Sequence, residues 1–525
     1  MSSAKEPVTR RFGNGLTVLI KEDKSHPVVS LQYWVGTGSM NEGHWQGSGL
    51  SHLLEHLVFK GTEHYSGQDL ARKVQERGGH WNAYTSVNRT VYYIDGPADS
   101  WQIFLNLLTE LVFFPTFPED ELEREKGVVR REMAMYADDP DSVAYQLLMQ
   151  TLYLKHPRRW PVLGEPAAFD CLTRQDVLDY HASRYVPNNV VLSIAGDVDA
   201  AEIFSHLELL VEDLKSRPLN RELIPHEPHQ FGSRRVRKEF AVPYSKLNLA
   251  WRLPCSGHPD TPALSALASI LGGGRSARFY EKFHDRLGLV YSIEVHSNQS
   301  ETDEGAFTIS IDVDRAQRDK VRDLVLQELR NLAQEDFTED LKRVCKQTRV
   351  SRLRRRSSAA GVASEMGADW FGARNLNLSS EWQEAIERVT TEDLHRVCST
   401  WLSSPNVTEV SLDPVGSNAA EEDGSAAGTE TALSEHVLGN GMKVVIREDH
   451  RLPLAYACLA FKAGCRAENE HDAGVTDLMS ECLLKGTATR SAGDIARFLE
   501  DIGGAINTST GNNLSLIHIS EPTRL

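Results

Sequence analysis

A segment near the N-terminus returns in altered form more than four hundred residues later. The stretch Gly49–Thr62 (GLSHLLEHLVFKGT) matches Gly474–Thr487 (GVTDLMSECLLKGT) at an offset of 425 residues. Further upstream, Arg11–Asp23 (RFGNGLTVLIKED) matches Val437–Asp449 (VLGNGMKVVIRED). A repeat of this length is a duplicated domain and not a solenoid, whose units have about 20–50 residues. The chain therefore uses one fold at least twice.

The first copy carries His52, Glu55 and His56 in a segment whose apolar spacing predicts a helix. Positions i, i+3 and i+4 share one helix face, so both imidazoles and the carboxylate point the same way. Two histidines at this spacing can hold Zn²⁺, and a carboxylate beside them can act on zinc-bound water. The order is inverted relative to the commoner HExxH motif. The alternative is a polar helix face with unrelated histidines.

The second copy replaces these three residues with Asp477, Ser480 and Glu481. Both imidazoles are lost, so this set cannot rebuild the same metal site. We therefore expect the fold to be used twice and the metal once, with one zinc ion per chain.

A second predicted helix, from Pro118 to about Tyr136, carries Glu125 and Glu132. Seven residues make nearly two helical turns, so both carboxylates share one face. A row of carboxylates on a helix is usually exposed to solvent, and the spacing by itself leaves that alternative open.

Composition narrows the class of protein. A chain of 525 residues predicts three or four domains. The net charge of −17 argues against a nucleic-acid partner. No apolar run reaches the ~18 residues of a membrane span, and the N-terminus lacks the apolar core of a signal peptide. Seven scattered cysteines form no CxxC pair, which indicates reduced thiols in a reducing compartment. Because neither a signal peptide nor a membrane span is seen, we expect a cytoplasmic location.

These motifs together resemble the M16 peptidases, the insulinase-like and pitrilysin-like metalloproteases known as inverzincins. The resemblance rests on HLLEH (His52–His56), GGHWNAYTS (Gly78–Ser86), the pair Glu125 and Glu132, GGGRSARFY (Gly272–Tyr280) and the degenerate second copy. It implies an α+β fold of tandem homologous domains, each a mostly antiparallel sheet with helices packed on one face.

The resemblance also implies roles for individual residues. His52, His56 and Glu132 would be the zinc ligands, Glu125 would support them from behind, and Glu55 would be the catalytic base. A strand that pairs with the bound peptide would be formed by Asn82, Ala83, Tyr84 and Thr85.

We expect the domain boundaries to follow the repeat. The predicted parts are a catalytic zinc domain at 1–215, a linker at 216–232, a second domain without metal at 233–413, a flexible linker at 414–433 and a partial degenerate repeat at 434–513. The last residues, Leu514–Leu525 (LSLIHISEPTRL), break the correspondence and resemble a translated sequencing adapter. We expect a gene truncated in the third domain with a foreign tail; the alternative is a divergent native C-terminus.

The resemblance predicts a zinc-dependent metalloendopeptidase. Such an enzyme hydrolyses bonds in peptides or small unfolded proteins through a zinc-activated water. The alternative is a non-catalytic M16-like scaffold or partner subunit. The expected partners are a peptide or unfolded polypeptide substrate and, for assembly, another M16 half or a second copy of this chain.

Overall fold

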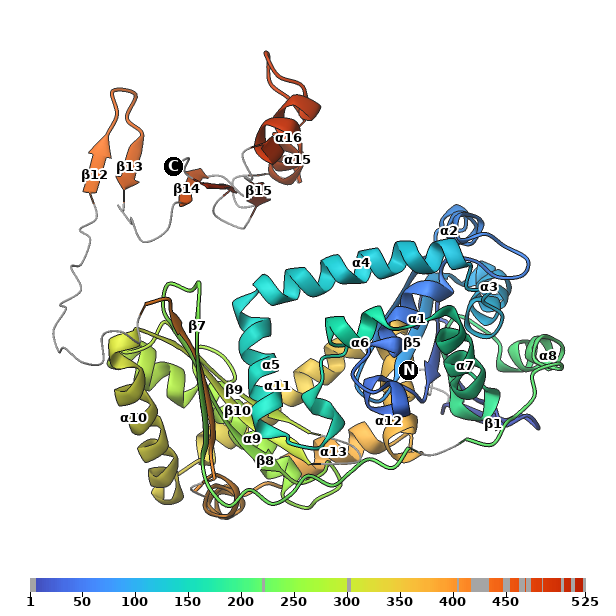
Figure 1. Cartoon of the computed structure of the whole chain (residues 1–525), viewed down its shortest axis with the longest axis horizontal. Coiled ribbons are helices and arrows are strands. Elements are labelled where there is room, and N and C mark those ends of the chain that lie inside the picture. Colours follow the sequence, from blue (N-terminus) through green and yellow to red (C-terminus); the bar gives the residue numbers. More distant parts are fainter. Residues whose placement is uncertain are drawn as a thin grey trace. The chain divides into compact units, whose positions relative to one another are not determined.

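The chain forms two compact units, Met1–Glu422 and Asp423–Leu525 (Figure 1). The computed structural model describes residues 6–219, 222–299, 304–403, 406–416, 434–446, 454–461, 468, 474–483, 485–501, 505–510 and 515–522. Most of the predicted linker 414–433 therefore lies outside the described residues. Within these ranges, no helix combines the length and the apolar composition that a membrane crossing requires.

The first sheet of the larger unit has six strands in the order β1-β2-β6-β3-β5-β4. Their bounds are β1 Val8–Arg11, β2 Thr17–Glu22, β3 Val28–Val35, β4 His80–Thr85, β5 Thr90–Pro97 and β6 Val190–Gly196. Neighbouring strands are antiparallel, except that β2 and β6 run parallel. β3 and β6 are buried almost throughout, whereas β4 at the sheet edge alternates between exposed and half-buried residues. The central strands are therefore covered on both faces and β4 is not.

Helices from the first half of the unit cover one face of this sheet. They include α1 Leu50–Val58, α2 Gly67–Glu76, α3 Trp101–Phe113, α4 Glu119–Asp138, α7 Arg174–Arg184 and α8 Ala200–Leu210. Leu53 and Leu57 of α1 and Phe104 and Leu108 of α3 share one core cluster with the strand residue Ile194. Apolar side chains three and four residues apart place one face of each helix on the sheet.

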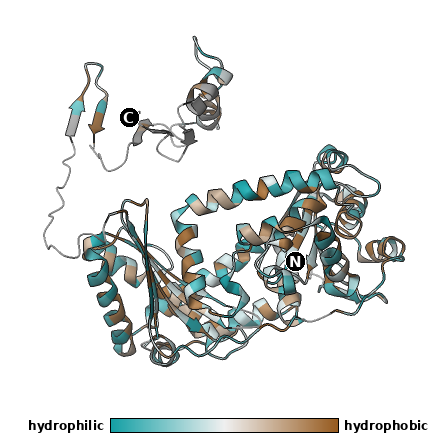
Figure 2. Ribbon diagram, viewed as in Figure 1, coloured by the Kyte–Doolittle hydropathy of each residue, from teal (hydrophilic) through white to brown (hydrophobic). Residues whose placement is uncertain are grey.

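The second sheet has five strands in the order β7-β11-β8-β10-β9. Their bounds are β7 Arg234–Phe240, β8 Ser245–Leu253, β9 Ser292–Asn298, β10 Gly305–Val313 and β11 Thr408–Pro414. Four helices cover one face of this sheet: α9 Thr261–Gly272, α10 Arg318–Asn331, α11 Thr338–Arg355 and α14 Thr391–Val397. In Figure 2, α10 alternates hydrophilic and hydrophobic stretches. Its buried residues Val321, Val325 and Leu329 lie four residues apart, as an amphipathic helix requires.

The larger unit has two halves, one built around each of its two sheets, and each half contributes one helix to the sheet of the other. α5 (Pro140–Leu152) follows α4 in the first half but packs on the second sheet, where Leu148 and Leu152 join Ala250 and Val410 in one cluster. α12 (Ala359–Ala373) comes from the second half and packs on β3 and β6 of the first sheet. The α+β class with mostly antiparallel sheets is confirmed. The expectation of helices on one face is incomplete, because each sheet also carries a helix from the other half.

The smaller unit repeats the strand arrangement of the first sheet. It begins with a hairpin of β12 Ser434–Val437 and β13 Lys443–Ile446. A sheet of order β14-β16-β15 follows, with bounds β14 Leu454–Phe461, β15 Ala505–Thr510 and β16 Ser515–Pro522. Two helices, α15 Val475–Cys482 and α16 Ala492–Asp501, lie between β14 and β15 in the sequence. The order matches β3-β5-β4. β16 lies inside the suspected foreign tail, whose origin stays a prediction, as do the domain boundaries.

A buried ion pair joins α10 to β11. Arg318 and Asp413 are both fully buried and form a hydrogen-bonded pair. Asp413 Oδ1 also accepts hydrogen bonds from the hydroxyls of Ser245 and Ser411, each at 2.6 Å. Burial raises the pKa of Asp413, but the bonds from the two serines and Arg318 outweigh it and hold the pKa below its usual value. Asp413 is therefore a charged, fully partnered group in the core.

We predict that Asp413→Ala destabilises the chain by about 3–5 kcal/mol, because it leaves the buried guanidinium of Arg318 without its buried partner. Urea unfolding of the larger unit measures the change. Asp323→Ala is the matched control: it removes an ion pair to Arg322 from a carboxylate that is 67% exposed, so it should change stability by less than about 1 kcal/mol. Equal effects of the two substitutions would contradict the role assigned to Asp413.

Candidate metal centre

The helix α1 carries His52, Glu55 and His56 on one face. It begins after Gly49, whose φ of 74° is left-handed, and its apolar residues Leu53, Leu54 and Leu57 are fully buried. Because these side chains pack into the core, the remaining face turns toward α4 and β4. His52 is nearly buried, whereas Glu55 and His56 are half-buried.

The three predicted metal ligands lie together. Glu132 Oε2 is 3.9 Å from His52 Nε2 and 3.8 Å from His56 Nε2. One ligand atom from each of the three residues falls within 4.8 Å of the others. The separations to Glu132 are too long for hydrogen bonds, and they leave room for an ion bound at about 2.0–2.2 Å. Two imidazoles and one carboxylate are also a donor set that zinc accepts.

Glu125 connects α1 to α4 behind this cluster. Its Oε2 is 3.2 Å from His56 Nδ1, and its Oε1 is 2.7 Å from the ammonium of Lys60. The side chain is buried, which disagrees with the solvent-exposed alternative. Burial raises the pKa of Glu125, but bonds from His56 and Lys60 outweigh it and lower the pKa. The charged carboxylate therefore holds the His56 ring so that Nε2 faces Glu132.

Burial sets the charge state of His52. Burial away from solvent, and to a smaller extent repulsion from His56, lowers the pKa of His52 to about 4. Its ring is therefore neutral at pH 7 and keeps a lone pair for a ligand bond. Burial also lowers the pKa of His56, but the hydrogen bond that its ring donates to Glu125 and the charges of Glu55, Glu125 and Glu132 raise it overall.

Glu55 is held from the opposite side by the strand β4. The Thr85 hydroxyl donates a hydrogen bond to Glu55 Oε2 at 2.5 Å. Burial raises the pKa of Glu55, while the Thr85 hydrogen bond and His56 act against that rise. A carboxyl group whose pKa lies above its usual value is better suited to accept and return protons near neutral pH.

The four residues Asn82–Thr85 form most of the edge strand β4. Ala83 and Thr85 face the core side, and Tyr84 points outward with 38% of its surface exposed. The Ala83 amide donates to the side chain of Asn82 at 2.8 Å. This edge of the sheet has no neighbouring strand among the described residues.

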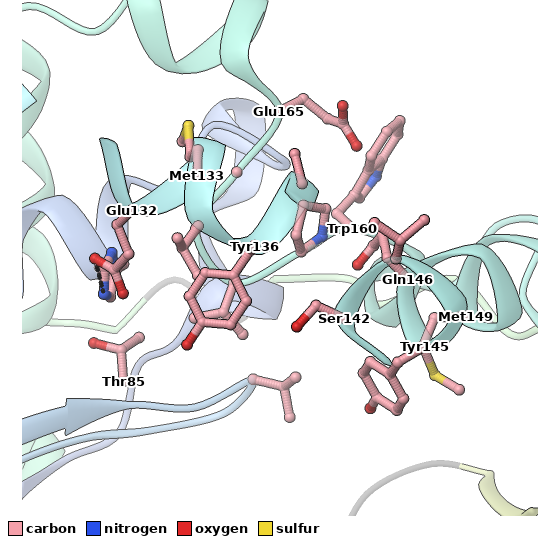
Figure 3. A pocket seen from close by; sticks show the side chains of 18 of the residues that line it. Thr85, Glu132, Met133, Tyr136, Ser142, Tyr145, Gln146, Met149, Trp160 and Glu165 are labelled. Carbon is pink, nitrogen blue, oxygen red and sulfur yellow. Dashed lines mark ion pairs between the residues drawn. The ribbon is translucent and has the colours of Figure 1, made fainter. Parts of the chain in front are cut away.

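A cavity of about 760 Å³ opens beside the cluster (Figure 3). It runs from Thr85 and Glu132 past Tyr136 to Tyr145, Met149 and Trp160. Its lining also includes His52, Glu55, the segment Pro161–Leu163 and Lys238 from β7 of the second half. The walls are mostly apolar and aromatic, with a few charged groups, as in most sites that bind a ligand.

Several of these residues were absent from the sequence prediction. Lys60 pairs with Glu125, and a signal for it existed, since Lys60 is retained as Lys485 in the repeat. Tyr136 and Trp160 had no such signal, because an aromatic residue on a helix or loop is as common in a core as in a cavity.

Comparison with protein-family models identifies the family. The model described as "Insulinase (Peptidase family M16)" matches residues 17–165 and again 443–515, and the model described as "Peptidase M16 inactive domain" matches residues 172–347. The chain belongs to the M16 peptidase family. The first model matches on both sides of the second one, in agreement with the internal repeat.

Curated relatives carry related names. An uncharacterized zinc protease of Rickettsia felis is 27% identical over 406 residues, which are 75% of this chain and 94% of that protein. An uncharacterized zinc protease of Bacillus subtilis is 29% identical over 296 residues, 56% of this chain and 71% of that protein. A probable mitochondrial-processing peptidase subunit beta of Arabidopsis thaliana is 24% identical over 422 residues, 79% of each chain.

Solved structures agree with the fold. A protease from Helicobacter pylori superposes with a TM-score of 0.71 at 26% identity and covers 78% of this chain and all of its own. A structure from Pseudomonas fluorescens, titled as a peptidase M16 inactive domain, has a TM-score of 0.72 at 21% identity, with 78% and 98% coverage. The second likeness shows the fold alone.

We predict that Gly49→Ala destabilises the larger unit by about 2–5 kcal/mol. A left-handed backbone costs an alanine about 1–2 kcal/mol, and overlap with packed backbone adds about 1–3 kcal/mol. At Gly49 an added Cβ would lie 2.0 Å from the carbonyl oxygen of Leu163 in the cavity wall. Urea unfolding measures the total.

Gly288→Ala separates the two contributions. Gly288 also has a left-handed φ, 59°, but an added Cβ there would meet no atom within 4 Å. It should therefore show only the backbone cost. If both substitutions destabilise the unit equally, the close contact between α1 and the cavity wall has no energetic weight.

Proposed function

We propose that this chain is a zinc-dependent metalloendopeptidase that cleaves peptides or unfolded polypeptides. The observation that carries the proposal is the convergence of His52, His56 and Glu132 beside Glu55, at the edge of a cavity. Zinc as the metal is supported by the donor set and by the relatives named zinc proteases. One ion per chain and a cytoplasmic location stay predictions.

In this proposal His52, His56 and Glu132 hold the zinc ion, and Glu125 holds the ring of His56. A zinc ion bound there supplies Lewis-acid polarisation of a carbonyl and makes water acidic enough to attack near neutral pH. Three protein ligands are the number found in catalytic zinc sites, which keep one position open.

Glu55 is the proposed proton carrier. Its carboxylate takes a proton from the attacking water and then delivers it to the nitrogen of the leaving amine. Thr85 holds one oxygen of the carboxylate through its hydrogen bond at 2.5 Å, and the other oxygen would take the proton. Burial raises the pKa of Glu55 and thereby makes its carboxylate a stronger base.

The proposed substrate is an extended peptide that pairs with β4. Residues Asn82–Thr85 lie at the open edge of the sheet, and such an edge offers main-chain hydrogen bonds to any extended chain. The Asn82 side chain, which accepts from the Ala83 amide, would be displaced by a substrate carbonyl. Pairing along β4 would bring the peptide past Thr85 and hence past Glu55.

A non-catalytic partner subunit is the second candidate. It is favoured by the name of the model that matches residues 172–347 and by the likeness to a processing-peptidase subunit. Those matched residues belong mostly to the second half, whereas the metal cluster lies in the first. Pairing with another M16 half or with a second copy is compatible with either candidate.

We predict that Glu55→Gln retains zinc but lowers kcat by at least about 10²-fold, because it removes the proton carrier and no ligand. His52→Ala and Glu132→Ala should both lose zinc and activity. Metal analysis after gel filtration and hydrolysis of a quenched peptide measure the two properties separately. Wild-type zinc binding without any hydrolysis would favour the partner-subunit candidate. Near-normal hydrolysis by Glu55→Gln would contradict the role of Glu55.

We predict a preference for a bulky apolar residue next to the scissile bond, because the cavity walls are mostly apolar. A peptide with Phe at that position should show kcat/KM about 10-fold or more above its Ala analogue. Tyr136→Ala should reduce this ratio, since Tyr136 projects into the cavity and is 44% exposed. Leu209→Ala, an exposed site on α8, is the control. An unchanged ratio in Tyr136→Ala would remove the cavity from substrate selection.

A further inference from the structure

A buried glutamate lies at the start of the helix that carries the histidines. Glu42 is 1% exposed and stands seven residues before Gly49. Its Oε1 accepts a hydrogen bond from the Ser51 backbone N–H at 2.8 Å. The Ser51 hydroxyl and the backbone N–H groups of Gly49 and Gly47 also interact with this carboxyl group. Glu42 therefore caps the first turn of α1 from outside the helix.

The helix needs such a partner. The first backbone N–H groups of any helix lack an acceptor within the helix, and the N-cap residue of α1 is Gly49, which has no side chain to supply one. α1 has only nine residues, so one turn is a large part of it. A shift or rotation of this turn would move His52, which is the residue directly after Ser51.

A second bond fixes the same turn. The Tyr180 hydroxyl of α7 is 2.7 Å from the Ser51 hydroxyl and 2.6 Å from the hydroxyl of Thr37, just after β3. Ser51 and Tyr180 are fully buried, as is Thr37. The start of α1 is thus held by hydrogen bonds to Glu42 on one side and to α7 on the other.

We propose that Glu42 is a positioning residue for the metal site: by accepting the Ser51 N–H it fixes the place of α1 and thereby the distance between His52 and Glu132. The inference rests on the proposed function, since it assumes that these residues bind zinc. Among the described residues, Glu42 forms no hydrogen bond with the predicted ligands, and it does not line the cavity.

The smaller unit contains the same cap without the histidines. Glu468 accepts hydrogen bonds from the backbone N–H groups of Gly474 at 2.7 Å and Thr476 at 2.8 Å, at the start of α15. Gly474 and Thr476 correspond to Gly49 and Ser51 in the repeat. The cap therefore belongs to the shared fold, and in the larger unit it also holds a helix with two imidazoles. This gives an internal control for any test of Glu42.

The acceptor oxygen matters more than the charge. Burial raises the pKa of Glu42 to about 8, against the hydrogen bonds that lower it. The group is therefore largely uncharged at pH 7, and glutamine, which keeps an acceptor oxygen, should replace it. Alanine removes the acceptor and leaves the Ser51 N–H buried without a partner.

The test measures zinc affinity by chelator competition, together with the visible spectrum of the Co²⁺-substituted full chain. We expect Glu42→Ala to raise the zinc Kd about 10–100-fold, the range typical of groups that support metal ligands, and to change the Co²⁺ spectrum. Glu42→Gln should restore both to within about 3-fold of wild type. Glu468→Ala should leave both unchanged, because α15 carries no predicted ligand set.

Several outcomes would overturn the proposal. Wild-type zinc affinity and an unchanged spectrum in Glu42→Ala would show that the cap has no role at the metal site. Equal losses in Glu42→Gln and Glu42→Ala would mean that the acceptor oxygen is not the determinant. If Glu42→Ala fails to fold, Glu42→Asp, whose side chain is one methylene shorter, moves the acceptor oxygen away from the Ser51 N–H, and an unaltered Co²⁺ spectrum in that variant contradicts the proposal. If the wild-type chain itself binds no zinc, the proposed function fails instead.

Discussion

The contact between α1 and α4 is the constraint on which the candidate site depends. α1 supplies both imidazoles and α4 supplies Glu132, so the cluster exists only while the two helices keep their relative position. Glu125 provides that constraint from a buried position on α4. Its carboxylate binds His56 of α1 and Lys60, which lies just beyond the end of α1. The directions of the two pKa shifts agree with this contact, since the pKa of Glu125 is lowered and that of His56 is raised by their mutual hydrogen bond. A buried charge held by two partners resists displacement more than an exposed one.

Local spacing explains which parts of the site could be predicted. His52, Glu55 and His56 follow from helical periodicity, and so does the shared face of Glu125 and Glu132. Periodicity could not show that these two faces meet, since it contains no information on helix packing. The family resemblance supplied that step, and the ligand atoms of His52, His56 and Glu132, which lie within 4.8 Å of one another, agree with it. Their roles in binding and catalysis stay proposals.

The exchange of α5 and α12 could not be predicted from periodicity. Each helix has an apolar face, but an apolar face shows that a helix is covered and not which sheet covers it. α5 begins at Pro140, directly after the N-cap residue Asp139 that separates it from α4, and its Leu148 and Leu152 pack on strands more than ninety residues later. Only the structure shows that α12 packs closely on the first sheet at Gly367, where an added Cβ would lie 2.3 Å from the ring of Trp34 in β3. Long-range contacts of this kind leave little trace in a single sequence.

The exchange also gives the second half a part in the candidate site. Tyr145 and Met149 line the cavity from α5, and α5 is held in place by the second sheet through Ala250 and Val410. Lys238 of β7 contributes to the same lining from the second half itself. The region matched by a model named for an inactive domain therefore supports a wall of the cavity beside the histidines. The second half can therefore contribute to the candidate site without supplying any of the three clustered side chains, because the position of the wall depends on the sheet beneath it.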